Sequence, residues 1–178
     1  MKRSRAWALA SGTNLFINAC DFTNDYKSEK YEENLDQARN YFNDLESQVA
    51  LLPEDQQGLL FRKCAVNCVS NTVLPFLRAR REKCGEDLDL FFSNQEDSEY
   101  SFQRVIEKGH IYEMGYPRCF YFMHNMGFAK SKIHCECSRQ SILFILHELF
   151  PTKDFTVDIV STVLGGSDKC TFRVTLCI

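Results

Sequence analysis

Two runs of alternating residues near the C-terminus do most to constrain the fold of this chain. Residues 155–163 and 170–176 each place an apolar or small side chain at every second position. This period is typical of half-buried strands, and the segment 165–168 between the runs (Gly-Gly-Ser-Asp) is typical of a turn. We therefore expect two antiparallel strands with one buried face.

The segment before these strands predicts a second hairpin and two helices. Residues 100–116 alternate in the same way around a Lys-Gly turn at 108–109, which indicates a hairpin. Residues 119–126, which follow a proline, predict a short helix. Residues 135–150 predict a longer helix that ends before Pro151 and faces inward with Ile142, Ile145, Leu146 and Leu149.

The first half of the chain has the period of helices instead. We expect a helix over 28–52 and a second helix that starts at Pro53. Pro75 should kink or end this second helix, and Gly85 should stop the helical region after its basic tail. Residues 86–97 predict a polar connection.

These elements together predict the fold class. The chain should form a single α+β domain over residues 1–178, mainly helical over 1–97 and with the sheet in 98–178. We expect the N-terminal helices to pack on a C-terminal antiparallel sheet of about four strands, with helices between the two hairpins.

Charge and cysteine content narrow the classes of function. The net charge is −3, so no strong basic field is present to hold nucleic acid. No run of 18 or more apolar residues exists that would span a membrane. Nine cysteines is an odd number, which favours free thiols in a reducing, cytoplasmic compartment. The sequence predicts no cofactor, and an exposed strand edge offers a route to a homo-oligomer.

Several cysteines stand at predicted element boundaries, where side chains from separate elements can meet in one pocket. Cys135 or Cys137 opens a predicted helix, whose positive end favours a thiolate. Glu136 lies beside them and can act as a general base. Cys170 follows the turn of the last hairpin on the expected core face, and Cys119 follows Arg118 at a strand-to-helix junction.

Metal binding and plain packing are the alternatives for these thiols. Cys64 and Cys68 lie four residues apart on a predicted helix, so they share one face and could join a metal site. The single residue between Cys135 and Cys137 gives poor geometry for a structural zinc, although His134 could add an imidazole. Buried thiols that only fill the core are the third interpretation.

Three arginines could bind an anionic group. Arg118, Arg139 and Arg173 each carry a planar guanidinium that can hold a carboxylate through two hydrogen bonds. Alternation places Arg173 on the sheet face opposite to Cys170 and Phe172.

The order and spacing of these motifs resemble the L-2-amino-thiazoline-4-carboxylic acid hydrolase family. The resemblance covers about residues 98–178, and the family in turn is similar to 4-vinyl-reductase-type ligand-binding domains and more distantly to vesicle-tethering subunits. The residues that carry it are Arg118, Cys119, Tyr121, Gly127, Cys135, Glu136, Gly166, Cys170, Phe172 and Arg173.

The resemblance implies hydrolysis of a small cyclic amidine in a cysteine-lined pocket. No metal ligands are predicted, and metal binding by the thiols stays an open alternative. A thiolate of Cys119, Cys135 or Cys170 would add to the amidine carbon while Glu136 moves the proton, or Glu136 would assist a direct attack by water. Cys137 could take the place of Cys135 as the counterpart of the family's cysteine. The substrate would be held by Arg118, Tyr121 and Arg173.

Two other functions compete with hydrolysis. The same pocket could bind or sense a small molecule without reacting, which the Phe-rich composition and Ser138, in place of a family acid, favour. The fold could also serve as a protein-interaction scaffold.

Overall fold

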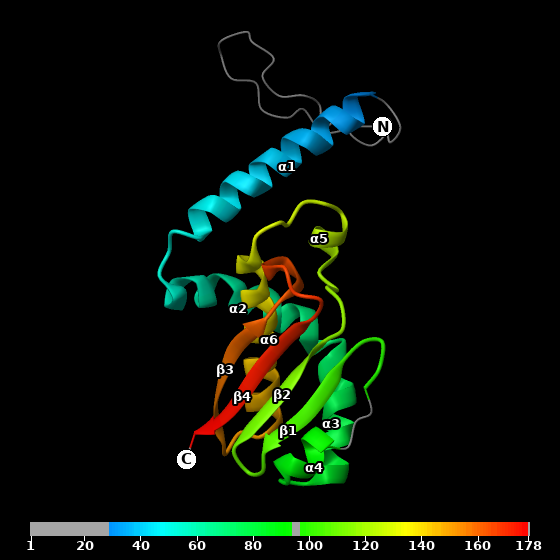
Figure 1. The fold of residues 1–178 in the computed structure, drawn as a ribbon, viewed down its shortest axis with the longest axis vertical. Coiled ribbons are helices and arrows are strands. Elements are labelled where there is room, and N and C mark those ends of the chain that lie inside the picture. The colour runs from blue at the N-terminus through cyan, green and yellow to red at the C-terminus, as the bar shows by residue number, and fades with distance from the viewer. Residues whose placement is uncertain (1–28, 94–96, 178) are drawn as a thin grey trace, which may run out of the picture. The chain divides into compact units, whose positions relative to one another are not determined.

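The computed structural model describes residues 29–93 and 97–177, shown in Figure 1. The chain forms two compact units, residues 1–40 and 41–178. In the first unit the described residues belong to the start of helix α1, where Arg39 pairs with Asp36 at 2.7 Å. The second unit holds the end of α1, the other helices and the sheet.

The order of elements confirms the predicted α+β fold, with helices first and a four-stranded antiparallel sheet at the C-terminus. The second hairpin is interrupted by the short 3-10 turn η3, and another 3-10 turn, η2, precedes α6. The elements are α1 (Glu29–Val49), α2 (Glu54–Ser70), α3 (Val73–Cys84), α4 (Leu88–Ser93), β1 (Phe102–Glu107), β2 (Ile111–Tyr116), α5 (Phe122–Asn125), η2 (Lys132–His134), α6 (Cys135–Leu149), β3 (Asp154–Ser161), η3 (Val163–Gly165) and β4 (Cys170–Cys177).

The sheet has the order β1-β2-β4-β3, so the two predicted hairpins lie side by side. Strands β2 and β4 form its centre, while β1 and β3 form its edges. Helix α6 packs on one face of the sheet (Figure 1). The predicted inward-facing residues of α6 are confirmed as buried, and they meet a strand face that includes Phe172 and Val174. The alternation seen in the sequence therefore marks the core.

The break between α2 and α3 differs from the prediction. The helix ends at Ser70, before Pro75, and α3 begins at Val73. Pro75 is thus the third residue of α3, where its missing N–H costs no helical hydrogen bond. The Thr72 hydroxyl donates to the Cys68 carbonyl at 2.5 Å and helps to close the end of α2.

The predicted polar connection over 86–97 is wrong in part, because it contains helix α4. The Asp87 carboxylate accepts a hydrogen bond from the Leu90 N–H at 2.9 Å, which caps this helix. Leu88, Phe91 and Phe92 are buried. A helix of six residues is too short to show a clear helical period in the sequence. Burial of its apolar side chains therefore stabilises α4 more than its local sequence pattern does.

The helix predicted over 119–126 is also shorter than expected. Only Phe122–Asn125 is helical, and Cys119 lies in the segment before it. Met126 and Gly127 end this turn, with the Gly127 N–H bonded to the His124 carbonyl at 2.8 Å. The segment between β2 and α6 therefore runs mostly as a loop.

Among the helices within residues 29–93 and 97–177, none has both the length and the apolarity needed to cross a membrane.

Candidate functional site

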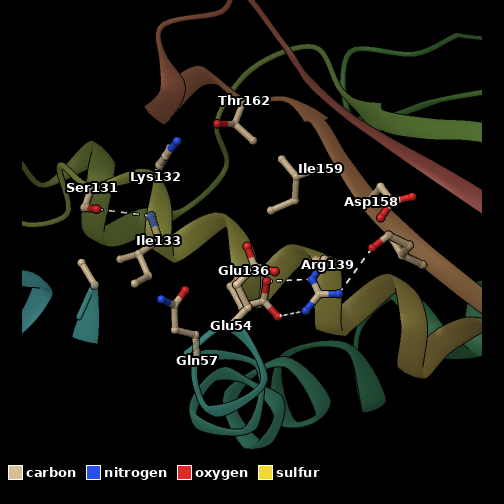
Figure 2. A pocket seen from close by; sticks show the side chains of 12 residues that line it. Glu54, Gln57, Ser131, Lys132, Ile133, Glu136, Arg139, Asp158, Ile159 and Thr162 are labelled. Carbon is tan, nitrogen blue, oxygen red and sulfur yellow. Dashed lines mark hydrogen bonds and ion pairs between the residues drawn. The ribbon is translucent and has the colours of Figure 1, made fainter. Parts of the chain in front are cut away.

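A pocket of about 560 Å³ lies where α2, η2, α6 and β3 meet. This volume is in the range of about 300–1,000 Å³ that ligand pockets usually have. Figure 2 shows polar side chains from all four elements around it. The lining residues are Ala50, Glu54, Gln57, Ser131, Lys132, Ile133, Glu136, Arg139, Val157, Asp158, Ile159 and Thr162. No cysteine is among these described lining residues.

A fixed ion pair forms one wall of the pocket (Figure 2). Both oxygens of the buried Glu136 carboxylate accept hydrogen bonds from Arg139, at 2.7 Å from Nε and 2.6 Å from Nη2. Gln140 Nε2 donates a third bond at 2.8 Å. The hydrogen bonds with Glu136 raise the pKa of the Arg139 guanidinium, whereas burial lowers this pKa. The negative charges of Glu136, Glu54 and Asp158 raise the pKa of Arg139 further. Glu136 is therefore held in place by its own helix.

Gly58 of α2 lies directly against this ion pair. A Cβ at this position would lie 3.0 Å from Gln140 Nε2 and 3.2 Å from Glu136 Oε1. Because glycine has no side chain, α2 can approach α6 closely enough to close the pocket wall. A Gly inside a helix has a propensity cost, so the close approach gives a reason for its presence here.

Three charged side chains of the pocket are unpaired within the described part of the chain. Glu54, Asp158 and Lys132 make no hydrogen bond or ion pair there through their side chains. Figure 2 shows Glu54 beside Glu136, whereas Lys132 points away from both. The pocket is lined by three residues with carboxylates, Glu54, Glu136 and Asp158, and by two cationic residues, Lys132 and Arg139. It therefore has one more carboxylate than cation.

The structure brings three of the predicted cysteines near one another. Cys135, Cys170 and Cys119 lie close enough for their charges to interact. The Val163 N–H donates to Cys170 Sγ at 3.4 Å, which turns this sulfur toward η3. These thiols thus form a cluster with each other, and none of them lines the pocket that holds Glu136.

Burial makes Cys135 and Cys170 poor nucleophiles. It raises the pKa of Cys135 to about 11, against a weaker lowering by a hydrogen bond with Thr162. Burial also raises the pKa of Cys170. At the start of α6 the desolvation of Cys135 outweighs the helix dipole, which the sequence suggested would favour the thiolate. At neutral pH both side chains carry their proton.

Cys137 belongs to a second group of thiols. Burial raises its pKa to about 11, and the nearby charges of Cys68, Cys64 and Glu136 add to the increase. Cys64 and Cys68 are exposed on α2. No three of the described His, Cys, Asp and Glu side chains are grouped so that they could hold a metal ion.

The predicted substrate-binding residues lie elsewhere. Arg118 stacks its guanidinium over the Phe120 ring at 4.9 Å, and Tyr121 stacks on His134 at 5.2 Å. Arg173 lies on the outer face of the sheet, as alternation predicts, and pairs with Glu113 at 2.9 Å. This pair belongs to a row of opposed residues across all four strands, Arg104, Glu113, Arg173 and Asp158.

A buried Glu–His pair adjoins the segment 131–133 that lines the pocket, and no sequence pattern indicated it. His134 Nε2 lies 2.7 Å from Glu46 Oε1, which also accepts the Lys130 N–H at 2.9 Å. The imidazole is stacked between Phe42 and Tyr121. The pair ties the end of α1 to the segment that carries Ser131, Lys132 and Ile133, so it positions one rim of the pocket.

The thiol environments predict a pattern of chemical modification. At pH 7.5 we expect iodoacetamide to alkylate the exposed Cys64, Cys68 and Cys177 first, and Cys135 and Cys137 far more slowly. The reactivity of the slow pair should rise as the pH increases from 9 toward 11, because the thiolate fraction rises. Peptide mass spectrometry over time measures each site. Fast alkylation of Cys135 in the folded protein at pH 7.5 would contradict this assignment.

Comparison of the chain with known protein families, with curated proteins and with solved structures finds no match.

Proposed function

We propose that this protein is a non-catalytic binding module whose pocket accepts a cationic group of a small ligand. An amine, an amidine and a guanidine all carry such a group. The observation that carries the proposal is the unpaired carboxylate of Glu54 beside the fixed Glu136–Arg139 pair in a pocket of about 560 Å³.

The charges of the pocket favour this class of ligand. Arg139 already donates to Glu136 and, at 3.5 Å, to the Val157 carbonyl, so it has little capacity to hold a ligand anion. Glu54 keeps free carboxylate oxygens, since its side chain has no hydrogen-bond or ion-pair partner among the described residues. A ligand cation would gain a charge-assisted hydrogen bond and balance the excess negative charge.

Binding is favoured over hydrolysis by the state of the predicted catalytic groups. The raised pKa values of Cys135 and Cys170 leave these two thiols little thiolate at neutral pH for attack on an amidine. Glu136 accepts three hydrogen bonds from Arg139 and Gln140, which leaves it poorly placed to take a proton from a substrate. The hydrolase activity and the family membership implied by the resemblance stay predictions.

The location of the protein in the cell also stays a prediction. The eight described cysteines are free thiols, which supports the reducing, cytoplasmic compartment inferred from the sequence.

Calorimetric titration with benzamidine tests the proposed cation site. We expect saturable binding to the full chain, and binding about tenfold or more weaker in Glu54→Gln, which loses the unpaired charge but keeps the side-chain shape. Glu82→Gln on α3 is the matched control, because Glu82 is exposed and does not line the pocket. Equal affinity in Glu54→Gln and Glu82→Gln would refute the role of Glu54.

The hydrolase alternative needs a separate assay. The full chain is incubated with L-2-amino-thiazoline-4-carboxylic acid, and the carbamoylated cysteine product is followed by mass spectrometry. Binding without product supports the module. Turnover that is lost in Cys119→Ser or Cys135→Ser would overturn it in favour of the enzyme.

A further inference from the structure

Strand β3 presents an open edge next to the pocket. It is the last strand in the order β1-β2-β4-β3, and in the described part of the chain no strand pairs with its outer side. The N–H of Leu176 on β4 donates to the His110 carbonyl at 2.9 Å, on the side of β2. Its register partner Phe155 therefore directs its own N–H and carbonyl away from β4.

The same outward direction of the backbone N–H and carbonyl groups recurs at every second residue of β3. The polar backbone groups of Phe155, Val157 and Ile159 face the open edge, since antiparallel strands bond through every second residue. Two contacts agree with this direction: the Phe155 N–H is capped by Asp154 Oδ1 at 3.0 Å, and the Val157 carbonyl accepts Arg139 Nη1 at 3.5 Å. The second bond is long and weak, so an incoming N–H could replace it.

The open edge and the pocket are continuous. Val157, Asp158 and Ile159 line the pocket, together with Glu54 and Arg139 from the helices (Figure 2). Ile159 is 40% exposed although it shares a strand face with the buried Val157. A strand added beside β3 would therefore project every second side chain into the pocket, toward the free carboxylate of Glu54.

We infer that the partner of this pocket is an extended peptide that pairs with the edge of β3 and places a lysine or arginine side chain beside Glu54. The inference rests on the proposed function, because it names the carrier of the cationic group. Main-chain hydrogen bonds supply affinity in this mode of recognition, and the side-chain pocket supplies specificity.

Charge decides between a foreign peptide and a second copy of the chain. Two copies paired through β3 would bring Glu54, Asp154 and Asp158 of each protomer toward the same edge, where like charges repel. A basic peptide meets the same carboxylates with the opposite charge. The bulge between Ile159 and Ser161 limits the paired stretch to the residues before it.

Three probes separate strand pairing from side-chain binding in titrations of the full chain. The first is a capped peptide that alternates threonine and valine around one central arginine. The second is the same peptide N-methylated at the residues that would donate to β3, and the third is N-acetylarginine amide. We expect the first to bind about tenfold or more tighter than the other two, because only it can complete the ladder.

Amide hydrogen exchange gives an independent readout. The unmodified peptide should protect the N–H groups of Val157 and Ile159, whereas benzamidine in the pocket should not. Equal affinity for all three probes, or no new protection, would overturn strand pairing and leave the cation site standing. If neither these probes nor benzamidine bind, the proposed function itself fails. A dimer in light scattering that already protects these amides would assign the edge to a second copy instead.

Discussion

Gly115→Ala is expected to destabilise the protein by about 3 kcal/mol, because the added methyl group has no room at the centre of the sheet. A Cβ at residue 115 would lie 2.0 Å from the backbone oxygen of Cys170 and 2.7 Å from Phe102 Cζ. The first contact is with main chain, so it cannot be relieved by rotating a side chain. Strands β2 and β4 would have to separate at this point.

Urea denaturation measures this effect. Thr175→Ala is the control on β4, because Thr175 is half-buried and its truncation removes only a small side chain; we expect a change of about 0.5 kcal/mol or less. A Gly115→Ala protein as stable as Thr175→Ala would show that β2 and β4 are not packed so closely.

Arg139→Ala is expected to destabilise the protein by about 2 kcal/mol, because it leaves the buried Glu136 carboxylate without its charged partner. The Glu136 side chain is only 10% exposed, and the substitution removes two of its three hydrogen bonds. The expected cost stays below that of a fully buried pair because Arg139 itself is 28% exposed.

Two further variants test whether the loss comes from the stranded carboxylate. Arg173→Ala breaks an ion pair in which the arginine is 45% exposed, and should cost less than about 1 kcal/mol. Adding Glu136→Gln to Arg139→Ala should recover part of the stability, because it removes the unpaired charge. If the double variant is no more stable than Arg139→Ala, the ion pair is not the cause.

The elements with a long regular period could be predicted from the sequence. Both hairpins and α6 lie where alternation and helical spacing placed them, since one face of each is buried against the other. Helix α4 could not be predicted in this way, because it is held by the burial of Leu88, Phe91 and Phe92 more than by a local pattern. Tertiary packing decided that element.

The site was predictable only in part, because its geometry depends on contacts between distant segments. The spacing of Glu136 and Arg139, three residues apart at a helix start, was visible in the sequence, but it left Arg139 as a possible ligand for a substrate anion. Arg139 binds Glu136 instead. Nothing in the sequence around Gly58 or Glu54 indicated that α2 packs against this pair, and no local motif joined Glu46 to His134.

The row Arg104–Glu113–Arg173–Asp158 favours one alignment of the four strands over its neighbours. The four residues stand opposite one another on the solvent side, with sign alternating from strand to strand. If β4 slid along β2 by two positions, Arg173 would face Ile111 or Gly115 in place of Glu113. Mispaired strands would thus lose their electrostatic attraction even when their apolar faces still met, which penalises the wrong alignment during folding.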